Sequence, residues 1–238
     1  MKPALSFVYK ISLYSAGALA TLYLLWVAFA LLLAPRLRLR AIKERLVDFE
    51  QPKINLLEIA TTLHEGDLIF HTSLSAQSQA IQLATHSPYS HCGLLYKTKG
   101  EWQVFEAVQP VKLARWVARG QGQHFVVKRL HDASTALTPS TLGRLRAAGQ
   151  PMLGHGYDLA FEWSDARIYC SELIWKVYDR GLHQQLGQLQ QLRDFDLSHP
   201  AVQAKLRERY GAQLPLAEPV ISPASIFNSP ELVTVVQR

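Results

Sequence analysis

Cys170 is one of only two cysteines in the 238-residue chain, and it stands directly before the amphipathic stretch SELIWKVYDRGL. Apolar residues recur there at helical spacing, so the pattern predicts a helix that begins at or near the cysteine. Unpaired backbone N–H groups and the helix dipole favour negative charge at such a position, which lowers the pKa of a thiol. The placement is typical of a nucleophile. A buried structural cysteine, or a disulfide to Cys92, is the alternative interpretation.

His91 and Glu106 are the residues that we expect to work with this thiol. A thiolate nucleophile usually shares its proton with a histidine. Of the nine histidines, His91 lies in YSHCGLLY at the start of a predicted strand, where Gly93 leaves the same strand face without a side chain. Cys92 points to the opposite face and is interpreted as structural. Glu106, between apolar residues in VFEAV, is placed on the next strand to orient the imidazole.

Five stretches in this order, GDLIF, SHCGLL, FEAV, GYDLAF and YCSELIW, resemble the YiiX/YaeF-like branch of the permuted papain-fold amidases. These are circularly permuted relatives of NlpC-type cell-wall peptidases and are similar to lecithin:retinol acyltransferase. The resemblance covers about residues 64–235. It implies Cys170 as nucleophile, His91 as base and Glu106 as orienting acid, without metal or cofactor. Cys92 departs from the family pattern, which has a small aliphatic residue there.

The resemblance implies a papain-like cysteine amidohydrolase or peptidase that cleaves amide or ester bonds through a thioester, with cell-wall peptides as one expected substrate. The main alternative is a lipase or acyltransferase on acyl lipids, and a non-catalytic binding module is another. We expect the backbone N–H of Cys170 to stabilise the oxyanion. Whether Tyr157 or Tyr169 supplies a second hydrogen-bond donor to the oxyanion is left open. Zinc held by His91, Cys92 and Cys170 is disfavoured, because adjacent strand residues diverge.

The elements that must position these residues follow from local patterns. Gly66-Asp67 predicts a turn before an apolar strand, and Lys99-Gly100 joins two strands as an antiparallel hairpin. Gly181 is expected to end the helix of Cys170. Residues 183–220 are interpreted as a lid or a peripheral helix. The pattern predicts an α+β domain with a mostly antiparallel sheet. Its expected strands are 64–72, 90–98, 101–110, 124–130 and 231–238, and its expected helices are 75–85, 138–152, 170–181 and 200–210.

The N-terminal run Ile11–Ala34 contains 24 residues and no charge. As a helix it would be roughly 36 Å long, enough to cross a bilayer, and it exceeds a typical signal-peptide core. We therefore predict a transmembrane anchor in residues 1–35, a basic juxtamembrane linker or helix in 36–63 and the papain-like domain in 64–238. A single-pass protein of a bacterial inner membrane is expected, with the side of the domain left open. The net charge is +6, and basic residues cluster directly after this run without interleaved aromatic residues. This pattern suits contact with anionic headgroups and argues against nucleic-acid binding.

Overall fold

The structure, a computed structural model, describes residues 55–107 and 109–238. The predicted membrane span Ile11–Ala34 lies outside the described residues. Within residues 55–107 and 109–238, no helix combines the length and the apolar character that crossing a bilayer requires. The predicted start of the domain at residue 64 is preceded by a short helix whose Ile59, together with the following Leu63, is buried in the core.

The strands and helices alternate irregularly along the chain, as expected for an α+β domain. In chain order the elements are α2 (Leu56–Ala60), β1 (Leu68–His71), α3 (Ala76–Thr85), β2 (His91–Thr98), β3 (Glu101–Phe105), β4 (Pro110–Lys112), α4 (Leu113–Ala118), η1 (Gln121–Gln123), β5 (Val126–Leu130), α5 (Ala133–Ala136), α6 (Pro139–Gly149), η2 (Gln150–Met152), β6 (Gly156–Tyr157), β7 (Arg167–Ile168), α7 (Cys170–Leu182), β8 (Gln190–Gln191), η3 (Leu192–Asp194), α8 (Pro200–Tyr210), β9 (Pro219–Val220), α9 (Pro223–Phe227) and β10 (Leu232–Gln237).

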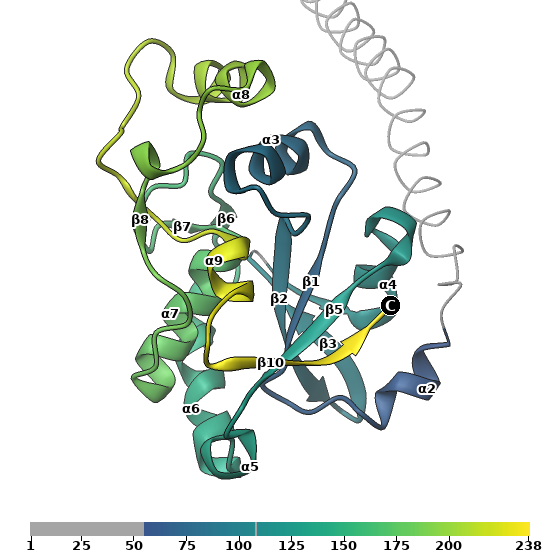
Figure 1. Cartoon of the computed structure of the whole chain (residues 1–238). Helices are drawn as coiled ribbons and strands as arrows, with labels where there is room; N and C mark the ends of the chain where they lie inside the picture. The colour runs from purple at the N-terminus through teal and green to yellow at the C-terminus, as the bar shows by residue number, and fades with distance from the viewer. Residues whose placement is uncertain (1–54, 108) are drawn as a thin grey trace, which may run out of the picture. The chain divides into compact units, whose positions relative to one another are not determined.

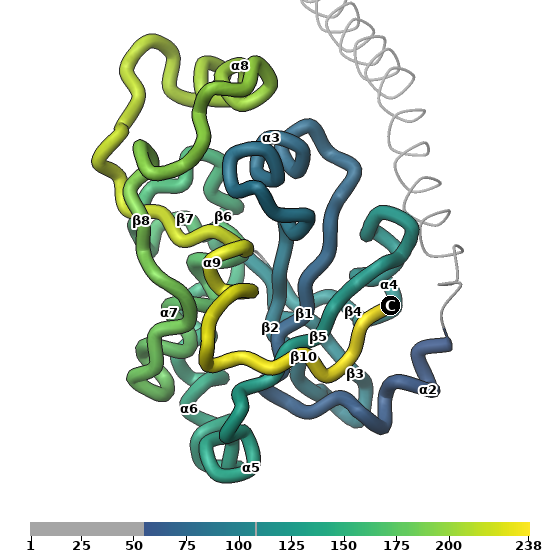
Figure 2. Tube along the Cα trace, viewed as in Figure 1, coloured from purple at the N-terminus to yellow at the C-terminus, as the bar shows by residue number. Residues whose placement is uncertain are grey.

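The main sheet has six strands in the order β10-β5-β1-β2-β3-β4, and every neighbouring pair is antiparallel. The mostly antiparallel sheet that the sequence predicts is therefore present. Figure 1 shows α6, α7 and α9 on one side of this sheet and α4 on the other. The tube in Figure 2 shows the C-terminal strand β10 beside β5, at the edge of the sheet.

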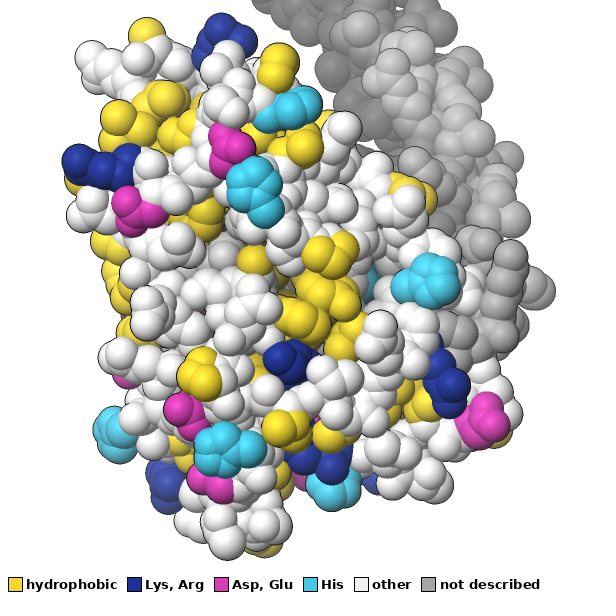
Figure 3. Space-filling model, in the orientation of Figure 1, with side chains coloured by type: hydrophobic (Ala, Val, Ile, Leu, Met, Phe, Trp, Pro, Cys, Tyr) yellow, Lys and Arg dark blue, Asp and Glu magenta, His cyan; other side chains and the backbone are white. Residues whose placement is uncertain are grey.

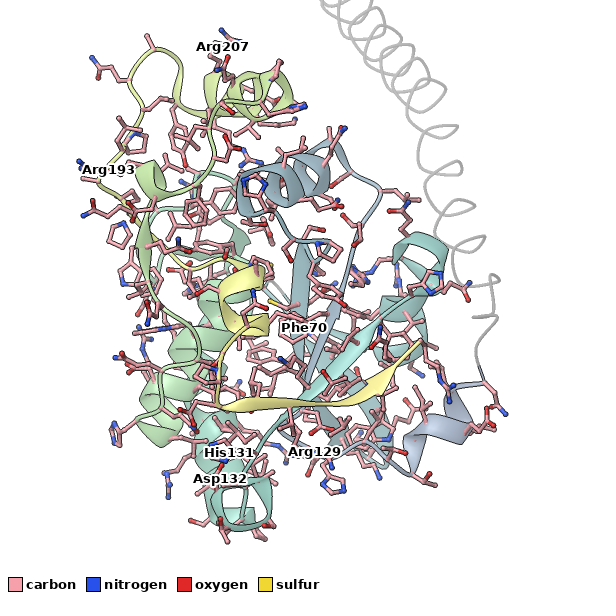
Figure 4. All side chains as sticks on the ribbon, viewed as in Figure 1. Phe70, Arg129, His131, Asp132, Arg193 and Arg207 are labelled. Atoms are coloured by element: carbon pink, nitrogen blue, oxygen red, sulfur yellow. The ribbon has the colours of Figure 1, made fainter. Side chains whose placement is uncertain are left out.

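Alternation along the strands gives the sheet two apolar faces, each with its own core. On β1, Leu68 and Phe70 face the helices α6, α7 and α9, whereas Ile69 faces α2 and α4. Phe70 is buried in the first core (labelled in Figure 4) and makes an edge-to-face contact with Phe227 of α9, with ring centroids 5.3 Å apart. The second core is centred on Trp116 of α4, which is fully buried. Both faces of the central strands are therefore covered.

The hairpin of β2 and β3 has the predicted two-residue turn. Thr98 pairs with Glu101, and the intervening Lys99 and Gly100 both have positive φ, at 51° and 83°. This geometry matches the twist of antiparallel strands and is accessible to glycine without steric strain. The turn fixes the register of the hairpin, and with it the relative positions of His91 at the start of β2 and Glu106 just after β3.

The helix α7 begins at Cys170, as the sequence predicts, but it does not end at Gly181. It continues to Leu182 and is closed by His183, which adopts the left-handed conformation with φ of 54°. Gly181 instead lies where α7 crosses α6: a Cβ there would stand 3.1 Å from the Cα of Leu145. The missing side chain serves close helix packing rather than termination, which a pattern of local stop signals does not distinguish.

The chain after α7 forms a peripheral layer that covers the end of the first core. Its two short strands β8 and β9 pair with each other, and α8 lies against α3. The backbone N–H of Asp196 donates to the carbonyl of Ala84 at 3.0 Å, which ties the layer to α3. Leu189, Leu214 and Leu216 are exposed on it, and Figure 3 shows hydrophobic side chains at the surface in this region.

Candidate active site

Cys170 is the first residue of α7, and its side chain is almost completely buried, at 2% exposure. The preceding Tyr169 has extended backbone, and its N–H donates to the carboxylate of Glu172 at 3.4 Å. Glu172 is paired in turn with Lys176 at 2.7 Å, so the first turn of α7 is firmly held. The thiol therefore lies where unpaired backbone N–H groups of the helix favour its anion.

His91 and Glu106 form a direct contact. The Nε2 atom of His91 lies 2.9 Å from Oε2 of Glu106, and the two side chains are 19% and 8% exposed. They share one face of the β2–β3 hairpin, as the alternation of the strands predicts. Because Nε2 is occupied by the carboxylate, Nδ1 is the ring nitrogen left for proton exchange with a thiol. The contact fixes both the tautomer and the orientation of the imidazole.

Arg119 extends this chain of contacts and has no counterpart in the sequence analysis. Its Nη2 donates to both oxygens of Glu106, at 2.8 and 2.9 Å. The residue caps the C-terminal end of α4, 13 residues after Glu106 along the chain. No local pattern marks an arginine at a helix end as the partner of a strand carboxylate, so only the fold reveals it. Arg119 holds Glu106 as an anion in the orientation that His91 requires.

The space that Gly93 was expected to leave beside the imidazole is filled. A Cβ at Gly93 would stand 2.2 Å from Cγ1 of Val104, so the neighbouring strand packs directly over the glycine. The imidazole of His91 lies instead in a stack of rings with His71 and Trp116, at centroid distances of 5.2 and 5.8 Å. Burial, together with the positive charges of His91 and Arg119, lowers the pKa of His71 to about 2. His71 is therefore a neutral packing ring.

Cys92 was expected to be a structural residue, but it contacts the proposed nucleophile. It faces away from His91, as alternation requires, but that face is the one on which α7 packs, and Cys92 lies beside Cys170. Both cysteines are free thiols rather than a disulfide. Burial, and then the interaction with Cys170, raises the pKa of Cys92 well above its usual value. The Cys92 thiol therefore remains protonated and is available as a hydrogen-bond donor to the neighbouring sulfur.

The pKa values of Cys170 and His91 are shifted in opposite directions. Hydrogen bonding with the Cys92 side chain holds the pKa of Cys170 well below its usual value despite burial, and the charge of His91 adds to this effect. Burial alone would lower the pKa of His91, but Cys170 and Glu106 outweigh it and raise that pKa to about 9. Burial likewise opposes the shift at Glu106, whose pKa is lowered by His91 and Arg119. The charges favour a thiolate–imidazolium pair at neutral pH.

The two tyrosines considered as second oxyanion donors differ in their position relative to Cys170. Tyr157, on β6, directs its hydroxyl toward Sγ of Cys170 at 3.9 Å, and a short parallel pairing of β6 with β7 positions it there. Tyr169 is buried, and its hydroxyl accepts from the backbone N–H of Ile221 at 3.1 Å. Tyr157 is thus at the sulfur, whereas Tyr169 is a core residue.

The comparisons with known proteins agree with the order of these elements. Residues 62–236 match the family model described as permuted papain-like amidase enzyme, YaeF/YiiX, C92 family. The chain belongs to the YaeF/YiiX family. The family's resemblance to papain-like enzymes agrees with the fold, because a cysteine helix packs on an antiparallel sheet that carries the histidine.

Two relatives of the YaeF/YiiX family are similar over most of the described domain. The uncharacterized protein YiiX of Escherichia coli K12 is 47% identical over 176 residues, which cover 73% of this chain and 86% of the relative. The crystal structure of the metalloprotein YiiX from Escherichia coli O157:H7 is 45% identical, with a TM-score of 0.71. That match covers 74% of this chain and 98% of the relative.

Proposed function

We propose that this chain is a cysteine hydrolase that cleaves amide or ester bonds, with Cys170 as nucleophile, His91 as general base and acid, and Glu106 as the residue that orients His91. The observation that supports this most directly is the contact of His91 with Glu106 through Nε2 beside a buried cysteine of lowered pKa at a helix N-terminus. Nδ1 of His91 is thereby the ring nitrogen left to exchange a proton with Cys170.

The reaction follows from these roles. The Cys170 thiolate attacks the acyl carbon and forms a thioester, while the bond to the leaving nitrogen or oxygen breaks and the His91 imidazolium protonates that atom. Water then gives its proton to His91 and its hydroxide to the acyl carbon, which releases a carboxylic acid and restores the pair. The backbone N–H of Cys170 and the hydroxyl of Tyr157 are the proposed donors to the oxyanion. Peptides and acyl lipids pass through the same steps.

A metal does not enter this proposal. One relative is described as a metalloprotein. Within residues 55–107 and 109–238, however, no group of three or more His, Cys, Asp or Glu side chains is placed to hold a metal ion. Nε2 of His91, a natural ligand atom, is already bound to Glu106. The described donor set therefore does not fit a metal centre, and we assign the chemistry to the side chains alone.

The uncharged run Ile11–Ala34 and the basic residues that follow it support a further part of the proposal, that the enzyme is held at a membrane by a single N-terminal span. A bacterial inner membrane is the proposed location. The tether would keep the hydrolase near substrates at the bilayer surface, whether these are cell-wall peptides or lipids.

Labelling with iodoacetamide across pH tests the proposed nucleophile. We expect Cys170 to react at pH 6 at least tenfold faster than a free thiol, because its thiolate persists there, and Cys170→Ala to lose all labelling and turnover. His91→Ala should lose nearly as much activity, since the two residues act as a unit. Cys92→Ala should keep labelling at Cys170 but shift it to higher pH. A Cys170 that reacts no faster than a free thiol would instead support a binding module.

A further inference from the structure

An apolar cavity lies beside Cys170, between α3, the start of α7, and the layer that carries α8. The cavity and the open solvent at its mouth together have an empty volume of about 680 Å³. The surface that it offers is almost wholly apolar. Its hydrophobic wall includes Ala84, Phe195, Leu197, Val202, Leu206 and Ile221.

Most polar side chains in the same wall have protein partners. Among the charged ones, Lys205 pairs with Glu208 at 2.6 Å, and the Arg209 guanidinium lies over the ring of Phe161. Ser171 donates to the carbonyl of Ile221 at 2.8 Å, and Ser222 accepts from the N–H of Ser225 at 3.0 Å. The hydroxyl of Tyr169 is occupied by the N–H of Ile221. A polar substrate group that entered this cavity would lose its hydration without recovering hydrogen bonds, whereas a hydrocarbon chain would not.

A second cavity, with a mixed polar and apolar wall, lies beside His91. It has an empty volume of about 530 Å³ and contains His91 in its wall instead of Cys170. Four serines line it: Ser73, Ser75, Ser78 and Ser90. Their hydroxyls form two hydrogen-bonded pairs: Ser73 with Ser75 at 3.2 Å, and Ser78 with Ser90. Hydroxyls both donate and accept, so this cavity suits a polar group.

The two cavities meet at the catalytic pair. Gln77, Ile81 and Tyr157 belong to the walls of both. Cys170 must contact the acyl carbon, and His91 must protonate the leaving atom, so the acyl group and the leaving group separate on either side of the pair. The acyl group therefore extends from Cys170 into the apolar cavity, and the leaving group extends past His91 into the serine-lined cavity.

We propose that the substrate is an acyl ester or amide in which a hydrocarbon acyl group is joined to a small polar alcohol or amine. This rests on the proposed cysteine hydrolase and names its substrate class. A cell-wall peptide, which is polar on both sides of the cleaved bond, matches only one of the two cavities. Each methylene that enters the apolar cavity raises kcat/KM by up to about fourfold until the cavity is filled.

Hydrolysis of p-nitrophenyl esters by the full chain tests the acyl side, because the leaving group stays constant. Pentanoyl and N-acetylglycyl esters form a matched pair of similar length that differs by an amide group. After correction for spontaneous hydrolysis, we expect kcat/KM to rise at least 20-fold from acetyl to octanoyl, and pentanoyl to exceed N-acetylglycyl at least tenfold. Equal rates along the series, or faster cleavage of N-acetylglycyl, would overturn the proposal.

Substitution of the cavity wall localises the effect. Ala84→Phe fills the apolar cavity and is expected to lower the octanoyl-to-acetyl ratio of kcat/KM at least tenfold. Ala147→Phe, the same change at an exposed position of α6 outside either cavity, is the matched control and should keep the wild-type ratio. An unchanged ratio in a folded Ala84→Phe variant would overturn the placement of the acyl chain. The wild-type ester series remains decisive if that variant does not fold.

The leaving-group side is tested with 2-hydroxyethyl octanoate and propyl octanoate, which have nearly the same size. We expect the hydroxyethyl ester to be cleaved at least tenfold faster, because its hydroxyl bonds within the serine-lined cavity. Equal cleavage, or preference for the propyl ester, would contradict this assignment. Failure of the underlying hydrolase is separate: it would appear as no turnover of any ester and no acyl group on Cys170 by mass spectrometry.

Discussion

At the scale of single residues, the charge of each site residue shifts the pKa of its neighbours. Glu106 carries the chain of contacts, because it binds His91 on one side and Arg119 on the other. Its negative charge favours the protonated imidazole, and the imidazolium in turn favours the thiolate of Cys170. A change at any member therefore alters the protonation of the others, which makes the pH dependence of activity the most informative measurement.

We expect a bell-shaped profile of kcat/KM whose alkaline limb falls near pH 9, where His91 loses its proton. Because Glu106 raises the pKa of His91, Glu106→Gln should move this limb to lower pH as well as reduce the maximum rate. Steady-state kinetics from pH 5 to pH 10 would check both. An alkaline limb that Glu106→Gln leaves in place would contradict the orienting role.

Arg119 is expected to act through Glu106 and not on substrate. Arg119→Met removes a charged donor from both carboxylate oxygens, which should lower kcat about tenfold with little change in KM. The pKa of Glu106 should rise, since Arg119 contributes to its lowering. Arg119→Lys keeps the charge and should restore part of kcat. An effect confined to KM would show that Arg119 binds substrate instead.

At the scale of elements, the position of the nucleophile depends on how α7 packs against its neighbours. Helix α7 packs on β2 and on α6, and its residues from Cys170 to Tyr178 are buried. Gly181 allows the close crossing with α6, because Cα and N of Leu145 stand 3.1 and 3.2 Å from where a Cβ would be. These are backbone atoms, which cannot yield as a flexible side chain does.

Two glycine substitutions distinguish the effect of this close packing on stability from the effect of helix propensity. Gly181→Ala should destabilise the protein by about 1–3 kcal/mol through overpacking. Gly143→Ala on α6, where nothing lies within 4 Å of the new methyl group, should be neutral or stabilising by up to about 1 kcal/mol. Urea unfolding of both variants measures the difference. A Gly181→Ala variant as stable as Gly143→Ala would refute the close crossing.

At the scale of the whole molecule, segments far apart in the sequence meet to make two unlike cavities. Helix α3 contributes to both, and the layer with η3 and α8 closes the apolar one. Residues 183–220, interpreted from the sequence as a lid or a peripheral helix, supply part of the cavity wall beside the nucleophile. Arg193 and Arg207 point outward from this layer (Figure 4), whereas Lys205 and Arg209 of α8 belong to the cavity wall together with its apolar residues.

The proposed anchor also belongs to this scale and is tested on the full chain. After expression in a bacterium, we expect the full-length protein to remain in the membrane pellet on washing with alkaline carbonate, because the span Ile11–Ala34 would be inserted. A chain that lacks residues 11–34 should move to the supernatant. Release of the full-length protein by carbonate would show that it is bound only at the surface.

The sequence by itself determined the candidate site because its signals are local. A cysteine before an amphipathic stretch, and a histidine and a glutamate on paired strands, are fixed by helical and strand periodicity and by the Lys99-Gly100 turn. The same local rules yielded the mostly antiparallel α+β fold. The tertiary structure alone decided what packs on each face: Arg119 on Glu106, Cys92 on Cys170, Val104 over Gly93, and the two cavities. Such contacts join side chains of different elements, and no periodicity within a single element encodes its partner.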